Sequence, residues 1–239
     1  MPVARAVGRV PARLSAVSTS ELTSPPALLL VAHGSTDPAF ASVVEAVAEQ
    51  VRELAPLLDV RIGYLEHGPP HLSDVAEPGA VAVPLLLSAG YHVRVDLPAQ
   101  AGDVVVTDAV GPDPRLADVL AQRLGEAGYT GGDVVLAAAG SADPRSLADV
   151  ETAAEQLSSV IGAGVTTAYV SAGQPRLSEL RPHTVASYLL APGAFATAVA
   201  DCGAAVVGTP LGAHPALAEI VLDRYRAAVG QPPGRTAPA

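Results

Sequence analysis

The chain has 239 residues, of which 49% are apolar and 16% charged, so we expect a folded protein. Its length suits two domains of about 100 to 150 residues each. The formal charge of −10 argues against a nucleic-acid binder, because phosphate contacts need a basic patch and no basic run occurs. The one cysteine, Cys202, excludes an intrachain disulfide and a cysteine-rich metal or iron–sulfur site, which indicates a reducing compartment and favours the cytoplasm.

Both ends of the chain are predicted to be disordered tails. Residues 1–26 contain scattered arginines and hydroxyl side chains but no continuous apolar stretch of signal-peptide length. An amphipathic targeting helix is the alternative for this segment, and its four prolines weaken that alternative. Residues 231–239 are rich in proline and form the second predicted tail. No segment offers the roughly 20 uninterrupted apolar residues of a membrane span, so we expect no membrane partner.

Short apolar runs follow the first tail in regular order. They cover residues 27–32, 60–65, 80–87 and 104–106, and each is nearly continuous. Strands that are buried on both faces have this pattern, which is typical of a parallel sheet covered by helices. The sequence therefore predicts an α/β fold.

A helix is predicted between the first two runs. Asp37 is a good N-cap residue, and Pro38 suits the first helical position. Apolar residues then recur every three or four positions from Val44 to Leu54, and Pro56 ends the pattern. Strands that alternate with helices imply right-handed crossovers between parallel strands.

The sequence repeats itself once. Two stretches recur closely, with five identical positions in each, and two more recur loosely in the same order. The pairs are 32–38 with 138–144, 64–73 with 169–178, 84–92 with 187–195, and 114–117 with 215–218.

This duplication predicts two similar doubly wound domains with parallel sheets and a cleft between them. We place the first half at residues 27–131 and the second half at residues 132–230, with the seam in the glycine-containing stretch 128–132. A chain with two matching halves can form such a cleft by itself, so we expect a monomer.

Three polar side chains stand where predicted strands of the first half end. His33 ends the first strand, Glu66 ends the second, and His92 follows the third after a glycine turn. Ligands of open parallel sheets bind beyond the carboxyl ends of the strands, where these loops converge. Two imidazoles and a carboxylate suit iron, cobalt, nickel or zinc, and an incomplete shell leaves room for a substrate.

The alternative for each histidine is a hydrogen-bonded loop residue, which is the commoner role of a lone histidine. The second half favours the metal site, because it keeps the surrounding glycine, serine, aspartate and proline residues but has Ala139, Ser171 and Phe195 at the three positions. The backbone therefore does not need the polar groups. Asp37 is interpreted as a helix cap, since Asp143 is retained in the second half.

The other histidines carry weaker signals. His67 and His71 are candidate auxiliary groups beside Glu66, with solvated turn residues as the alternative. His183 and His214 have no histidine counterpart in the first half and are read as surface or loop residues, His214 at a helix start.

The pattern around His33, Glu66 and His92 resembles the sirohydrochlorin and cobalt chelatase family of class II chelatases, in their long duplicated form. The resemblance extends over roughly residues 27–229 and includes a Leu-Leu-Val-Ala run before His33-Gly34-Ser35 and an Asp-Leu-Pro triplet after His92.

This resemblance implies an enzyme that inserts a divalent metal ion into sirohydrochlorin without ATP, in sirohaem or cobalamin biosynthesis. Fe²⁺ is favoured, with Co²⁺ close behind and Ni²⁺ as a third option. The resemblance implies that His33 and His92 bind the ion while Glu66 ligates it or accepts a proton. The absence of the histidine-rich tail and cysteine cluster of some cobalt-directed relatives carries the preference for iron.

A polycarboxylate substrate needs local positive charge on an acidic protein. We name Ser35, Arg94, Arg176 and Arg181 as candidate substrate-binding residues, together with backbone N–H groups at the helix starts. Two other functions stay open. One is a non-catalytic metal carrier or tetrapyrrole-binding protein, and the weaker one is a hydrolase using His33, which lacks a serine or cysteine nucleophile motif.

Overall fold

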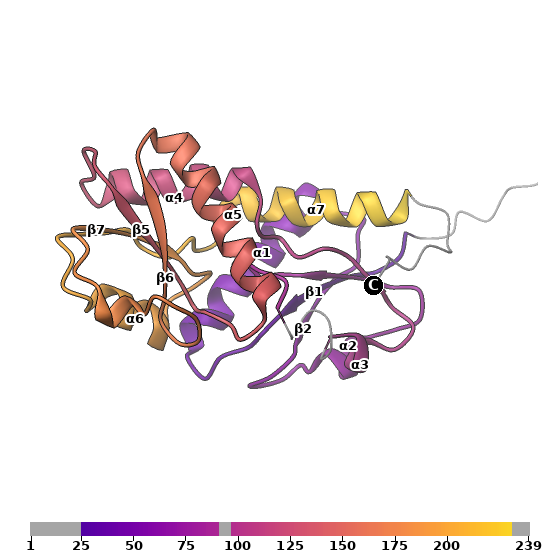
Figure 1. Cartoon of the computed structure of the whole chain (residues 1–239). Helices are drawn as coiled ribbons and strands as arrows, with labels where there is room; N and C mark the ends of the chain where they lie inside the picture. Colours follow the sequence, from indigo (N-terminus) through magenta and orange to yellow (C-terminus); the bar gives the residue numbers. More distant parts are fainter. Residues whose placement is uncertain (1–24, 91–96, 231–239) are drawn as a thin grey trace, which may run out of the picture.

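The computed structural model describes residues 25–90 and 97–230 and contains two four-stranded parallel sheets (Figure 1). The first sheet has the strand order β2-β1-β3-β4, and the second has the matching order β6-β5-β7-β8. The strands of the first sheet are β1 (Leu28–Ala32), β2 (Val60–Tyr64), β3 (Val81–Pro84) and β4 (Val105–Val106). Those of the second sheet are β5 (Val134–Ala138), β6 (Val165–Tyr169), β7 (Thr184–Tyr188) and β8 (Val206–Val207). The predicted α/β fold with two parallel sheets is confirmed.

The helices also follow the same order twice. The first half has α1 (Pro38–Leu54), α2 (Leu72–Val75), α3 (Leu97–Ala101) and α4 (Pro114–Glu126). The second half has α5 (Pro144–Ile161), the 3₁₀ helix η2 (Leu177–Glu179), α6 (Ala194–Ala200) and α7 (Pro215–Val229). All four long helices begin with proline, and the residue before it caps the helix by accepting a hydrogen bond from a backbone N–H. Asp37 and Asp143 are two of these caps, as predicted, and His214 caps α7 in the same way.

Each sheet is buried on both faces. In β1, Leu28 and Leu30 point into the core formed with the long helices, whereas Leu29 and Val31 pack on the opposite face beneath α2 and α3. Side chains alternate between the two faces of a strand, so a continuous apolar run is what such a position requires. The core on the long-helix side contains residues of both halves, and it joins the two sheets into one apolar interior.

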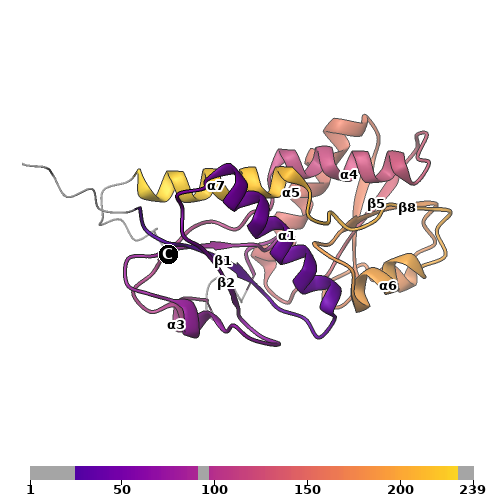
Figure 2. The same ribbon diagram turned by 180° about the vertical axis from the view of Figure 1, so that it is seen from behind.

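The last helix of each half packs on the other half. Helix α4 contacts α5 and β7 of the second half, and α7 contacts α1 and β3 of the first half. Figures 1 and 2 show α7 beside α1 and α4 beside α5. The sheets therefore follow the predicted division into residues 27–131 and 132–230, while the helices cross it. Whether these two ranges are separate domains remains a prediction.

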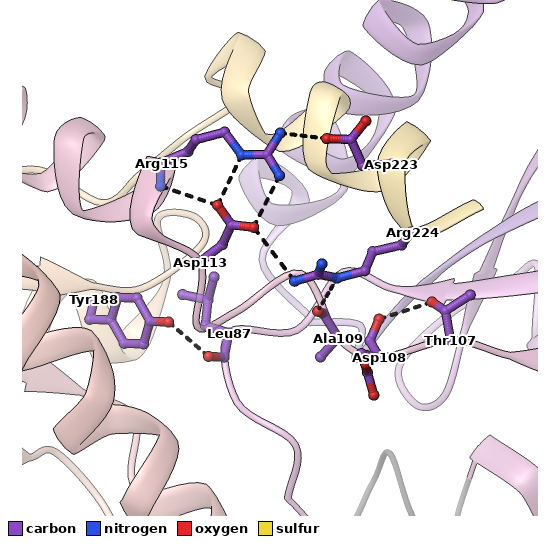
Figure 3. A network of polar contacts seen from close by, with 9 residues as sticks. All are labelled: Leu87, Thr107, Asp108, Ala109, Asp113, Arg115, Tyr188, Asp223 and Arg224. Carbon is purple, nitrogen blue, oxygen red and sulfur yellow. Dashed lines mark hydrogen bonds and ion pairs between the residues drawn. The ribbon is translucent and has the colours of Figure 1, made fainter. Parts of the chain in front are cut away.

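A buried carboxylate links α4 of the first half to α7 of the second half. Asp113 caps α4, and its side chain is 8% exposed and bonded to Arg115 at 2.9 Å (Figure 3). Arg115 also pairs with Asp223 of α7 at 2.8 Å, and Arg224 of α7 lies 3.5 Å from Asp113. Burial alone would raise the pKa of Asp113, but the hydrogen bonds from Arg115 and the charges of both arginines together lower it.

We expect Asp113→Asn to lower the free energy of unfolding by about 2 to 3 kcal/mol at pH 7, because it leaves Arg115 and Arg224 without their buried charged partner. The folded-state pKa of Asp113 is depressed, so the carboxylate stabilises the protein above its unfolded pKa of about 3.9. This stabilisation is lost as the pH falls through the lower, folded-state pKa. Denaturant unfolding from pH 7 to pH 3 should therefore show the gap between wild type and variant closing below about pH 4. A gap that stays constant over this range would contradict the assignment.

The predicted tails fall almost entirely outside the described residues. Pro25 and Pro26 are the exceptions, and the carbonyl oxygen of Pro26 accepts a hydrogen bond from the Tyr225 hydroxyl at 2.6 Å. Within residues 25–90 and 97–230, no helix is long and apolar enough to cross a membrane.

Candidate functional site

A cavity of about 1020 Å³ lies between the carboxyl ends of the two sheets. The loops after β1 and β3 form its wall on the side of the first half, and the loops after β5 and β7 form the facing wall. This cavity, called the cleft below, lies where ligands of open parallel sheets bind. The predicted cleft between the halves is thus present.

The loops that carry His33 and Glu66 are held together through their backbones. The N–H of Glu66 donates to the carbonyl oxygen of His33 at 2.8 Å, and the N–H of Leu65 donates to that of Ala32 at 3.0 Å. Gly34 has a positive φ of 95°, and a Cβ at this position would lie 1.8 Å from the carbonyl oxygen of Glu66. Only glycine permits such a close approach, so the His33-Gly34 sequence brings the two predicted site residues into adjacent loops.

Three polar side chains gather at this point. The ring centroids of His33 and His67 are 6.3 Å apart, and His67 Nε2 lies 3.5 Å from Glu66 Oε2. His33 is half-buried, with Nδ1 3.2 Å from the carbonyl oxygen of Gly34. Glu66 is more exposed than His33 and is not among the residues that line the cleft, whereas both histidines line it.

His67 has an unusual backbone. Its φ is 52°, and among the residues that the structure describes no other non-glycine residue has a positive φ. Such conformations cost free energy and are concentrated at functional sites. The sequence offered His67 only as an auxiliary group, and its position beside Glu66 was the available signal. The structure places its ring near that of His33, a contact that the sequence analysis did not predict.

Two predicted site residues, His92 and Arg94, lie outside the described residues. Among the residues that are described, no group of three or more His, Cys, Asp or Glu side chains is placed to hold a metal ion. The described part of the cleft therefore supplies two imidazoles, those of His33 and His67, with the Glu66 carboxylate beside them, and these three groups do not by themselves form a metal site.

The other predicted residues have the following positions. Ser35 lines the cleft, and its hydroxyl oxygen accepts a hydrogen bond from the backbone N–H of Asp37 at 3.0 Å. Arg176 precedes η2, and Arg181 is exposed and donates to the carbonyl oxygen of Leu180 at 2.8 Å. Neither arginine is among the residues that line the cleft. His71 caps α2 through its backbone N–H, which donates to Asp74 at 3.0 Å, so it has a structural role there.

The cleft walls are largely apolar. Both phenylalanines of the chain, Phe40 and Phe195, line the cleft, and Phe195 is 44% exposed. Leucines after β3 and β7 continue the same surface, and serine hydroxyls are spaced along it. No lysine or arginine lines the cleft in the described part of the chain. This surface suits a large, flat, mainly apolar ligand with polar groups at its edge.

The second half keeps this framework without the imidazoles. Ala139 stands in the position of His33 and lines the cleft, and the Ser171 hydroxyl donates to the carbonyl oxygen of Ala139 at 2.7 Å. Gly140 repeats the φ of 95° found at Gly34. The local backbone is therefore the same in both halves, although the side chains at the positions of His33 and Glu66 differ.

The fold and the cleft define a class of protein. It is a duplicated α/β protein with a large cleft between matching halves and, within the described residues, imidazoles on one wall of that cleft. The CbiX family model matches residues 27–127.

Relatives of known name agree with this match. A protein named sirohydrochlorin cobaltochelatase from Sulfolobus acidocaldarius is 33% identical over 109 residues, which cover 40% of this chain and 87% of that protein. A sirohydrochlorin ferrochelatase from Priestia megaterium is 28% identical over 184 residues, which cover 67% of this chain and 68% of that protein. The solved structure of SirB from Bacillus subtilis with Fe³⁺ has the same fold, with a TM-score of 0.72 and 22% identity over 86% of this chain and 96% of that one. The chain belongs to the CbiX family of chelatases, as the sequence resemblance indicated.

Proposed function

We propose that this protein inserts Fe²⁺ or Co²⁺ into sirohydrochlorin, with the macrocycle held in the cleft. One observation carries the proposal: two imidazoles, those of His33 and His67, lie on one wall of a large apolar cleft between matching α/β halves. The family and the names of its relatives support the same substrate and the same class of reaction.

The chemistry needs exchangeable ligands and a base. A hydrated metal ion must lose water while two pyrrole N–H protons leave the macrocycle, so a closed metal cage would hold the ion too tightly. We assign metal binding to His33 and His92, with Glu66 as a ligand or proton acceptor. The contact of His33 Nδ1 with the carbonyl oxygen of Gly34, at 3.2 Å, would orient the ring for this role.

His67 joins this set in the proposal. Its ring approaches His33 and its Nε2 approaches Glu66, so it can pass a proton between the cleft and the exposed carboxylate. The apolar walls with Phe40 and Phe195 would contact the faces of the macrocycle. Ser35 and Arg94 are assigned to the carboxylate groups at its edge. Arg176 and Arg181 lie away from the cleft lining, so this role is weaker for them.

The remaining parts of the proposal concern the whole chain. We propose that it works without ATP, as a cytoplasmic monomer whose two halves meet at residues 131–132. Iron is preferred over cobalt on the sequence argument above, and relatives with names for each metal support both ions.

Anaerobic spectrophotometry of sirohydrochlorin with Fe²⁺, Co²⁺ or Ni²⁺ tests the function. We expect the protein to accelerate loss of the metal-free spectrum over many turnovers, with no requirement for ATP. A stoichiometric complex that never turns over would refute the enzyme and favour the metal carrier. A rate equal to that of the uncatalysed mixture with all three metals would exclude chelation of this substrate.

A further inference from the structure

The wall of the cleft after β3 is held in place by the second half. Residues 87–90 follow β3, and Leu87, Ser88 and Gly90 line the cleft. Within the described residues, three hydrogen bonds reach this segment from the second half. They join Tyr188 Oη to the Leu87 carbonyl oxygen at 2.8 Å, Ser146 Oγ to Ser88 Oγ at 2.8 Å, and Asp149 Oδ2 to the Ala89 N–H at 2.7 Å. Figure 3 shows the first of them.

Two of these partners are buried. Tyr188 is 2% exposed and Ser146 is 4% exposed. Burial raises the pKa of Tyr188, so its hydroxyl stays protonated and donates to Leu87. Gly111 packs closely against the same hydrogen bond. A Cβ at this position would lie 2.4 Å from the Leu87 carbonyl oxygen and 2.6 Å from Tyr188 Oη. Because this buried hydrogen bond is closely packed on all these sides, it holds the Leu87 carbonyl group in a single orientation.

Asp149 is the charged member of the set. Its carboxylate accepts from a backbone N–H, and a hydrogen bond to an ionised acceptor is stronger than one between neutral groups. Asp149 is not among the residues that line the cleft, and its hydrogen bond to Ala89 connects it to the 87–90 segment, which contributes residues to the lining.

The corresponding contacts of the other half are apolar. Alignment of the caps Asp37 and Asp143 puts Phe40 in the place of Ser146 and Val43 in the place of Asp149. Their side chains cannot hydrogen-bond the matching segment after β7, which contains Gly193. Polar anchoring therefore occurs on the segment of the half that has the imidazoles.

From this asymmetry we infer that Asp149, supported by Ser146, is a positioning residue for the reaction. It holds the 87–90 wall of the first half at the distance from the second half that metal insertion requires. The second half, which lacks the imidazoles, thereby takes part in the chemistry by fixing the other wall of the cleft. The inference rests on the proposed chelatase function.

The test compares Asp149→Ala, Asp149→Asn and the control Glu155→Gln in the full chain, with sirohydrochlorin and Co²⁺. Asparagine keeps an oxygen that can accept from Ala89, and Glu155 is an exposed acid on the same helix. We expect Asp149→Ala to lower kcat by about tenfold or more with KM changed less than threefold, since a small misplacement of a reacting group can cost up to about 100-fold. Asp149→Asn should recover most of kcat, and the control should match wild type.

Hydrogen exchange of the Ala89 amide supplies a second measurement that needs no activity. It should accelerate in Asp149→Ala and return towards the wild-type rate in Asp149→Asn. If the exchange accelerates while kcat stays within twofold of wild type, the positioning role is overturned. If wild type itself inserts no metal, the proposed function fails instead, and the two failures are thus distinguishable. The inference would also be overturned if both Asp149 variants had a lower free energy of unfolding and their loss of kcat were explained by the smaller fraction of folded protein.

Discussion

Replacing His33 by alanine is expected to lower the rate of metal insertion by about 100-fold or more. Even groups outside the ligand shell of a metal contribute about 10- to 100-fold to affinity or activity, and His33 is assigned to the shell itself. The loss should persist at saturating sirohydrochlorin, because the macrocycle contacts of the cleft walls remain. Initial rates over a range of Co²⁺ and sirohydrochlorin concentrations would measure it.

The matched control is His71→Ala. His71 lies in the loop of Glu66 and His67, is exposed, and caps α2 through its backbone N–H rather than its ring. Its removal should leave the rate within about twofold of wild type. If His33→Ala retained the full rate, the site would have been assigned to the wrong wall of the cleft.

Most of the fold could be predicted from the repeat. Strands that are buried on both faces read as short apolar runs, and the aspartate-proline pairs marked the starts of α1 and α5. The third strand was predicted over residues 80–87, but β3 ends at Pro84, and the leucines beyond it line the cleft. Apolar sequence cannot distinguish a buried strand from an apolar ligand wall.

The exchange of α4 and α7 between the halves could not be predicted. Each helix is amphipathic, and that pattern indicates which face of the helix is buried. It does not indicate which of the two sheets the helix packs against. Arg115, which pairs with Asp113, also pairs with Asp223 of α7, 108 residues later in the sequence, and no motif links these two positions.

The candidate site could be predicted in part. His33 and Glu66 were identified because parallel strands deliver their carboxyl ends to one edge, and their loops are indeed hydrogen-bonded to each other. The proximity of His67 to both depends on its left-handed backbone, which no local signal revealed. The arginines were named for their charge, and charge alone does not tell which face of a loop a side chain occupies.

Replacing Gly34 by alanine tests the framework that both halves share. Gly34 combines a φ of 95° with a Cβ position 1.8 Å from the carbonyl oxygen of Glu66, and that atom belongs to the backbone and cannot rotate away. We expect the free energy of unfolding to fall by more than about 4 kcal/mol, because strain, which costs about 1 to 3 kcal/mol alone, adds to displacement of the Glu66 loop. Denaturant unfolding of purified protein would measure it, and failure to fold is the extreme of the same result.

The chain offers a control that separates the two causes. Gly68 has a φ of 103° in the same loop system, but a Cβ there meets nothing within 4 Å, so Gly68→Ala should cost only the strain of about 1 to 3 kcal/mol. Gly140→Ala should resemble Gly34→Ala, since its Cβ would lie 1.9 Å from the carbonyl oxygen of Ala172. Equal losses at Gly34 and Gly68 would show that the close approach adds nothing. Equal losses at Gly34 and Gly140, in halves with and without the imidazole, would instead assign the glycine to folding and leave His33 to chemistry.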